Sequence, residues 1–198
     1  MKIALRCRCG QLQGEVESAG IAARITCYCK DCQAYARFLH EHPDFLDTAG
    51  GTDVAASLPA ALRFTSGTEH LACMSLGPKG ILRWYAACCR TPIGNTPRDM
   101  KMPYVGLVRA SLAIPDADLD RQLGPPQVVV NTESARRPVA STPVRTAWTI
   151  ARVGASIVTA RLNGRYRTNP FFDASGTPVK RAQVLSLAER LALGDTTP

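Results

Sequence analysis

The chain has 198 residues, of which 45% are apolar, and its formal net charge is +8. This length suits one good core, or one domain with a substantial extension, and the apolar fraction indicates a folded globular protein. The basic surplus lies mainly in residues 133–198, which hold ten Lys or Arg and four Asp or Glu. No apolar run is long enough for a signal peptide or a membrane span, so we expect a cytoplasmic protein. Disulfides rarely persist in that compartment, so its eight cysteines indicate metal chemistry.

Short strands separated by turn residues dominate the first two thirds of the chain. Residues 11–17 alternate polar and apolar side chains with the period of a half-buried strand. A helical turn or two is expected at 33–39, and residues 40–60 read as a loop because they hold two prolines and Gly50-Gly51. The remaining strands are expected near 3–5, 22–26, 62–64, 71–76, 81–85, 105–113 and 127–131.

The composition changes near residue 133, where Pro138 and Pro143 bracket a linker. A helix is expected over 148–162, and a second one from the cap Thr177 to Gly194. We therefore predict a mainly β, zinc-stapled domain over residues 1–132, with a basic helical extension over 133–198 packed on it.

The cysteines fall into short groups that are typical of zinc sites. These groups are Cys7-x-Cys9, Cys27-x-Cys29-x-x-Cys32 and the pair Cys88-Cys89. Thiolates are preferred zinc ligands, and a structural site takes four of them in a tetrahedron. The central triplet supplies three ligands and leaves one position open for water or substrate, which is the mark of a catalytic site. The other groups would form a closed structural site; a single site sharing ligands among all groups is the alternative.

The order of these groups resembles the glutathione-dependent formaldehyde-activating enzyme family, which includes the centromere protein V type of domain. The resemblance covers roughly residues 5–132 and implies a zinc β-tent fold with two zinc ions. It also implies that Cys7, Cys9 and Cys89 are structural ligands, and that Cys27, Cys29 and Cys32 form the active site. The matching stretches are Cys7-Arg8-Cys9-Gly10, Cys27-Tyr28-Cys29-Lys30-Asp31-Cys32-Gln33 and Trp84-Tyr85-Ala86-Ala87-Cys88-Cys89-Arg90-Thr91-Pro92.

The chain departs from the family pattern at its last cysteine group. The family usually has Cys-x-x-Cys-Gly there. In this chain Ala86 stands in place of the first cysteine, and Arg90 stands in place of the glycine. Cys88 and Cys73 are both candidates for the fourth structural ligand. The family also often has a histidine where Tyr28 stands. The substrate is therefore not carried over with the resemblance.

Two functions are compatible with these residues. The first is a zinc-dependent, carbon–sulfur lyase-like enzyme acting on small thiol adducts, such as those of glutathione, at the triplet. His40 or His42 could then move a proton, and Gln33 could orient a zinc-bound water. The second is a non-catalytic zinc module whose basic C-terminal region binds a protein or, less expected, a nucleic acid. The apolar faces of the C-terminal helices also allow a homodimer.

Overall fold

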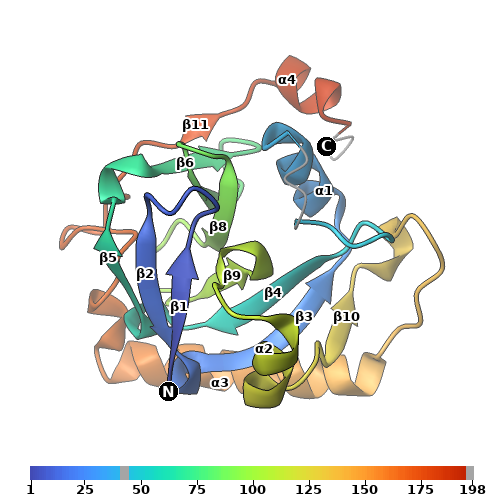
Figure 1. Cartoon of the computed structure of the whole chain (residues 1–198), viewed down its shortest axis with the longest axis horizontal. Helices are drawn as coiled ribbons and strands as arrows, with labels where there is room; N and C mark the ends of the chain where they lie inside the picture. The colour runs from blue at the N-terminus through green and yellow to red at the C-terminus, as the bar shows by residue number, and fades with distance from the viewer. Residues whose placement is uncertain (41–44, 195–198) are drawn as a thin grey trace.

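The computed structural model describes residues 1–40 and 45–194, and in these residues the strands form two sheets. The smaller sheet has the order β1-β2-β5, and the larger has the order β10-β3-β4-β9-β8-β7-β6-β11 (Figure 1). The edge strands β10 and β11 pair in parallel with β3 and β6. The strands are β1 (Lys2–Arg6), β2 (Gln13–Glu17), β3 (Ile21–Cys27), β4 (Thr52–Ser57), β5 (Leu62–Ser66), β6 (Leu71–Ser75), β7 (Leu82–Ala86), β8 (Thr91–Thr96), β9 (Val105–Val108), β10 (Val128–Val130) and β11 (Gln183–Val184).

The expectation of a mainly β protein is confirmed, and so are most of the expected strands. In β1, Ile3 and Leu5 are buried while their neighbours are exposed, as period-2 patterning requires. The expected strand at 105–113 is shorter, because β9 ends at Val108 and a 3-10 turn, Arg109–Ser111, follows. The hydroxyl of Ser111 donates to the carbonyl of Val108 and closes that turn.

Four elements were not expected from the sequence: β4, β8, β11 and the helix α2 (Asp116–Leu123). The loop predicted for residues 40–60 was wrong for 52–57, which form a strand between β3 and β9 in the larger sheet. Gly50-Gly51 is the turn that precedes this strand. A Cβ atom at position 51 would lie 2.6 Å from the aromatic ring of Tyr28 and 2.7 Å from the methyl group of Thr26, so this position has no room for a side chain.

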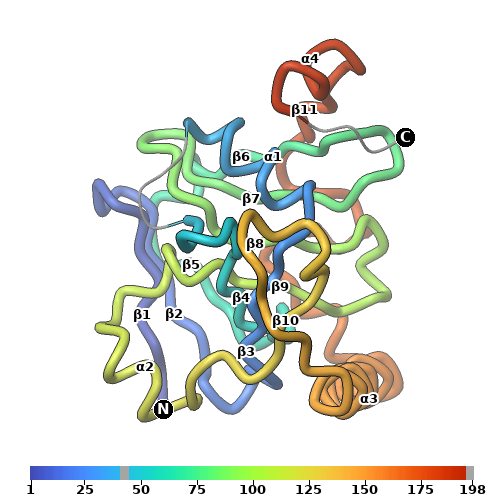
Figure 2. Tube along the Cα trace, turned by 90° about the vertical axis from the view of Figure 1, so that its right-hand side faces the viewer, coloured from blue at the N-terminus to red at the C-terminus, as the bar shows by residue number. Residues whose placement is uncertain are grey.

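The longest helix covers one face of the larger sheet. This helix, α3, lies along β3 and β10 at the edge of the molecule, as both views show (Figures 1 and 2). It confirms the helix expected over 148–162 and starts earlier, at Pro143. None of the described helices, this one included, has the length and apolar content needed to cross a membrane. The four α-helices in the described ranges are α1 (Lys30–Phe38), α2 (Asp116–Leu123), α3 (Pro143–Leu162) and α4 (Leu187–Ala192).

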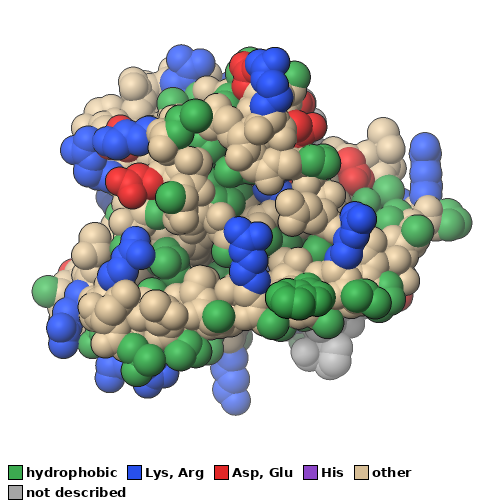
Figure 3. Space-filling view, turned by 90° about the horizontal axis from the view of Figure 1, so that it is seen from below, with side chains coloured by type: hydrophobic (Ala, Val, Ile, Leu, Met, Phe, Trp, Pro, Cys, Tyr) green, Lys and Arg blue, Asp and Glu red, His purple; other side chains and the backbone are tan. Residues whose placement is uncertain are grey.

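The outer face of α3 is apolar and exposed. Trp148 is 76% exposed and Leu162 is 83% exposed, and only Thr149 and Ala160 of this helix are buried. The helix holds three arginines and no Asp or Glu. Figure 3 shows this side of the molecule, with apolar side chains exposed and Lys and Arg side chains spread between them.

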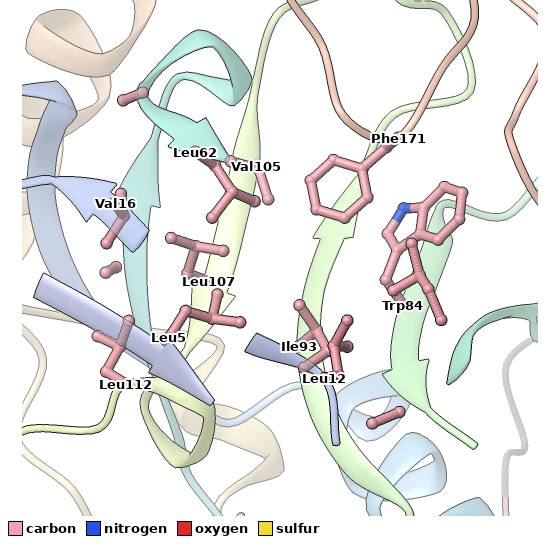
Figure 4. Packing of buried hydrophobic residues seen from close by; sticks show 14 of the residues in the cluster. Leu5, Leu12, Val16, Leu62, Trp84, Ile93, Val105, Leu107, Leu112 and Phe171 are labelled. Carbon is pink, nitrogen blue, oxygen red and sulfur yellow. The ribbon is translucent and has the colours of Figure 1, made fainter. Parts of the chain in front are cut away.

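The main core lies between the two sheets. Leu5, Val16 and Leu62 of the smaller sheet face Ile93 and Leu107 of the larger one (Figure 4). The C-terminal segment also enters this core, because Phe171 is fully buried with its ring centroid 4.9 Å from that of Trp84. The segment around Phe171 therefore packs against the larger sheet.

The prediction of a second C-terminal helix from Thr177 to Gly194 was wrong for the first half of that range. The amide of Thr177 donates to the carboxylate of Asp173, and Phe172 forms a bridge with Pro178, so the chain is extended here. Residues 183–184 then form β11. The helix α4 begins only after Ser186, which makes a capping box with Glu189.

Candidate metal centres

Four cysteines from two distant turns converge to form what we call the four-cysteine cluster: Cys7, Cys9, Cys88 and Cys89. Their Sγ atoms all lie within 4.8 Å of one another. Cys7 and Cys9 lie in the turn that follows β1, and Cys88 and Cys89 lie in the turn between β7 and β8. The cluster therefore joins the smaller sheet to the larger one.

The separations within this cluster fit a tetrahedral metal site. The Sγ of Cys88 is 3.8 Å from that of Cys7 and 3.3 Å from that of Cys9, and Cys7 and Cys9 are 3.5 Å apart. Zinc–sulfur bonds of about 2.3 Å place tetrahedral sulfurs roughly 3.8 Å apart, whereas a disulfide needs about 2 Å. The four thiols thus match the edges of a metal-centred tetrahedron and do not form a disulfide.

The local backbone presents the four thiols to one point. Gly10 has a φ of +78° and its amide donates to the carbonyl of Cys7, which closes the first turn. Arg90 has a φ of +59°, a left-handed conformation, directly after the second pair. Burial raises the pKa of Cys89, but hydrogen bonds with Thr91 and Cys9 outweigh it and bring that pKa to about 6. One thiolate is therefore available in the cluster near neutral pH.

Cys73 does not belong to either cysteine cluster. It is buried in β6 opposite Trp84, and its thiol donates to the carbonyl of Met74 at 3.8 Å. Burial raises the pKa of Cys73 to about 12. Of the two candidates for the fourth position, the structure brings Cys88 to the cluster and leaves Cys73 in the core.

The second cluster is the cysteine triplet, Cys27, Cys29 and Cys32. Cys27 ends β3, Cys29 is the N-cap of α1, and Cys32 lies in the first turn of that helix. Their Sγ atoms lie within 4.8 Å of one another, and no His, Cys, Asp or Glu within the described ranges joins them as a fourth. Among residues 1–40 and 45–194, the triplet therefore offers three metal ligands.

The start of α1 favours negative charge at the triplet. The amide of Cys32 donates to the Sγ of Cys29, and the helix N-terminus adds its positive dipole end. The pKa of Cys27 is lowered because Cys29 and Cys32 donate hydrogen bonds to it, and Asn131 donates another at 3.2 Å. The pKa values of Cys29 and Cys32 are raised by the same hydrogen bonds with Cys27. The partly exposed Cys27 therefore carries the first negative charge.

A buried arginine lies behind the triplet. Arg83, on β7, is 1% exposed and donates to Asp31 at 3.2 Å and to Asn95 at 3.3 Å. Its guanidinium also lies 5.3 Å from the ring centroid of Tyr35. Its positive charge acts on Cys32 and lowers the energy of the thiolate there. Arg83 thus places a positive charge, shared with Asp31, beside the triplet.

Two hydroxyl groups lie on the same side of the sheet as Cys27. Thr52 pairs directly with Cys27 across β3 and β4, so both side chains point to one face. Its Oγ1 is the one buried side-chain oxygen or nitrogen in the described part of the chain without a hydrogen-bond partner. The pKa of Tyr104 is raised to about 12, first by burial and then by the charges of Cys27 and Cys32. The orphaned hydroxyl fits a site that expects a further ligand.

Sequence reasoning missed Arg83, Asn131, Thr52 and Tyr104. Of these, Asn131 could have been suspected, because asparagine is one of the few residues that tolerate a left-handed backbone at the end of a strand. Asn131 adopts such a conformation, with a φ of +57°. Gln33 was expected to orient a water; its amide nitrogen instead donates to the carbonyls of Tyr28 and Ser134 and holds the adjoining loop. His40 is exposed with a φ of +59°, and His42 lies outside the described residues.

The largest cavity lies away from both clusters. It has a volume of about 850 Å³ and opens on the other face of β3, beside Arg24 and Asp53. Arg24 contacts Asp53 and Asp120, Arg109 contacts Asp116, and Asp47 accepts hydrogen bonds from the Tyr28 hydroxyl and from two backbone amides. With its charges satisfied and no cysteine in its lining, this cavity does not compete with the triplet as a reactive site.

Comparison with known proteins gives a family but no activity. A family model described as "Family of unknown function (DUF6151)" matches residues 1–183. No curated protein matches the chain. A crystal structure of a Rhodobacter sphaeroides protein is similar over 60% of this chain and 94% of its own length, at 22% identity and a TM-score of 0.43.

Proposed function

Because the chain belongs to the DUF6151 family, whose function is unknown, we propose a function from its two cysteine clusters. The protein binds two zinc ions, a structural one at the four-cysteine cluster and a second one at the triplet. At the triplet it forms or breaks the carbon–sulfur bond of a small thiol adduct, glutathione-like in its thiol part. A bound zinc would supply Lewis-acid activation of the sulfur or oxygen of the adduct.

The observation that carries this proposal is the three-thiol site with an unpartnered hydroxyl on its face. In the described part of the chain three cysteine ligands converge there, and Thr52 Oγ1 lacks a hydrogen-bond partner although it is buried. An adduct oxygen or sulfur bound beside Cys27 would give that hydroxyl a partner. Asn131 donates a hydrogen bond to Cys27, and the positive charge of Arg83 favours the thiolate of Cys32.

The chemistry needs no redox partner. A thiol sulfur adds to the carbonyl carbon of an aldehyde, the carbonyl π pair moves to oxygen, and that oxygen takes the proton that the thiol gives up. The reverse reaction breaks the carbon–sulfur bond. The role of this chain is to bind and orient the adduct and to lower the energy of its sulfur as an anion.

The resemblance to the formaldehyde-activating family supports this proposal at one further position. Arg90 stands where that family usually has a glycine, and its backbone has the left-handed φ that a glycine adopts without strain. Cys88 replaces the missing first cysteine of that group by joining Cys7 and Cys9. A β-tent built from the two sheets, with the four-cysteine cluster as its staple, is the fold that we propose on this basis.

The first test is zinc stoichiometry by elemental analysis of wild type, Cys29→Ser and Cys89→Ser. We expect two zinc ions per chain in wild type and one in Cys29→Ser, which stays folded because the four-cysteine cluster is intact. Cys89→Ser should lose the other ion and unfold at lower temperature. Thiol–aldehyde adducts are then followed by NMR with wild type and Cys29→Ser. A single zinc in wild type, or equal rates in both proteins, would refute the proposal.

A second candidate function is favoured by the outer face of α3. Trp148, Val144 and Leu162 are exposed on this face, and the helix has arginines but no acidic residues (Figure 3). Such a face suits a non-catalytic zinc module that binds an acidic protein, a nucleic acid or a second copy of itself. Two zinc ions with no effect on any thiol adduct would favour this alternative, and light scattering would separate a homodimer from a monomer.

A further inference from the structure

An apolar pocket lies between α3 and the larger sheet, on the face that carries the triplet. Its volume is about 250 Å³. The sheet contributes Ile25 and Val130, the helix contributes Val153 and Ile157, and Tyr104 closes one side. The exposed surface of its lining is almost entirely apolar, which suits the binding of a hydrocarbon group.

The pocket lies beside the triplet on the same face of the sheet, although no cysteine of the triplet lines it. Ile25 precedes Cys27 by two residues in β3, so both side chains point to the same face. Val130 pairs directly with Cys27 across the β3–β10 ladder. Tyr104 lines the pocket and is close enough to the triplet for the charges of Cys27 and Cys32 to raise its pKa. A ligand could therefore place its sulfur at the triplet and its carbon chain in the pocket.

A glycine inside α3 supplies the second observation. Gly154 lies in the interior of a 20-residue helix and lines the pocket. Glycine at such a position destabilises a helix by about 1 kcal/mol relative to alanine. Packing does not require it, because a Cβ atom at this position would meet no atom within 4 Å. Its effect is to leave the pocket open.

We propose that this pocket binds the apolar carbon group of the thiol adduct. This inference rests on the proposed function and names its substrate class: adducts in which a thiol has added to an aldehyde larger than formaldehyde, with a ring or a chain of several carbons. A cavity of about 150 Å³ binds benzene. The pocket is larger and takes an aromatic ring with a short chain.

The test compares two thiols as probes of the zinc-loaded protein by calorimetry. Benzyl mercaptan carries the apolar ring, and 2-mercaptoethanol offers the same thiol without it. We expect wild type to bind benzyl mercaptan about tenfold tighter or more, because the ring leaves water. Gly154→Phe fills the pocket and should remove this preference while leaving the affinity for 2-mercaptoethanol unchanged. Gly154→Val, a smaller filling, should reduce the preference in a protein of unaltered melting temperature.

Ala155→Phe is the matched control. Ala155 is the next residue of α3 but is exposed and does not line the pocket, so this variant should bind both thiols as wild type does. Equal affinity of wild type for the two thiols would overturn the pocket assignment and leave the proposed function standing. The same holds if Gly154→Val and Gly154→Phe, folded and zinc-loaded, keep the full preference. If neither thiol binds wild type that holds two zinc ions, the proposed function itself is overturned.

Discussion

At the scale of the residue, the same thiol has different chemistry in different surroundings. Cys73 lies among apolar side chains, and burial raises its pKa to about 12. Cys29 caps a helix and accepts a hydrogen bond from the amide of Cys32. Sequence spacing separated the clustered cysteines from Cys73, but it left open which one completes the four-cysteine cluster. That choice depends on the pairing of β6 with β7, which directs Cys73 into the core.

This difference predicts opposite effects for two serine substitutions. Cys88→Ser should reduce the zinc content from two ions to one, because it removes a ligand from the four-cysteine cluster. Cys73→Ser should keep both ions but lower the free energy of unfolding by about 1–3 kcal/mol, since it buries a hydroxyl in an apolar site. Elemental analysis and urea unfolding measure the two effects. Loss of zinc from Cys73→Ser would show that this assignment of ligands is wrong.

At the scale of the element, the alternating strand β1 and the fully buried strands β7 and β9, which are rich in aliphatic and aromatic residues, could be predicted, whereas β4 and β8 could not. β8 is buried at all six positions although it contains Pro92 and Gly94, and its residues show no period of two. β4 begins with Thr52 and Asp53, which are typical turn residues in the sequence. In the structure Asp53 pairs with the buried Arg24, which explains its place in a strand. The triplet could be predicted because its spacing is local. Its surroundings could not, because Arg83, Thr52, Tyr104 and Asn131 reach it only through the sheet.

The turn at Asp173 shows why the second C-terminal helix was placed too early. Its carboxylate accepts hydrogen bonds from the Ser175 hydroxyl and from the amides of Ser175 and Thr177. Beyond this turn the amide of Val179 donates to the carbonyl of Phe171, so the chain pairs with residues 171–172 where a helix from Thr177 would begin. The chain therefore continues as an extended segment until Ser186, where a capping box is available.

The same turn predicts a pH dependence. The pKa of Asp173 is lowered by the hydrogen bond from Ser175 and then by that from the amide of Thr177. A carboxyl group with a lowered pKa in the folded state stabilises the fold above its unfolded-state pKa, and this contribution is lost as the pH falls through the lowered value. Asp173→Asn should therefore be less stable than wild type at pH 7, and the difference should shrink as the pH is lowered below about 4. Urea unfolding over this pH range checks this, and a difference that stays constant as the pH falls would contradict it.

At the scale of the whole molecule, the C-terminal third contributes to the core beside the part that carries the two cysteine clusters. The ring centroid of Phe171 lies 5.7 Å from that of Phe64, and the same ring also contacts Trp84. β11 adds to the edge of the larger sheet beside β6, while α3 covers β3 and β10. Residues 133–198 therefore cover apolar surface that residues 1–132 would otherwise expose to water.

This arrangement predicts that residues 1–132 alone do not form a stable native fold. Phe171→Ala should lower the free energy of unfolding by about 3–5 kcal/mol, through lost burial and the cavity it leaves, which is a large share of the 5–15 kcal/mol typical of a domain. Leu162→Ser, an exposed position in the same segment, should change it by less than about 0.5 kcal/mol. A chain of residues 1–132 with a cooperative melting transition and two bound zinc ions would contradict this prediction. It would mean that the two sheets and their cysteine clusters fold without Phe171, so that the C-terminal helices serve the pocket beside the triplet and not the core.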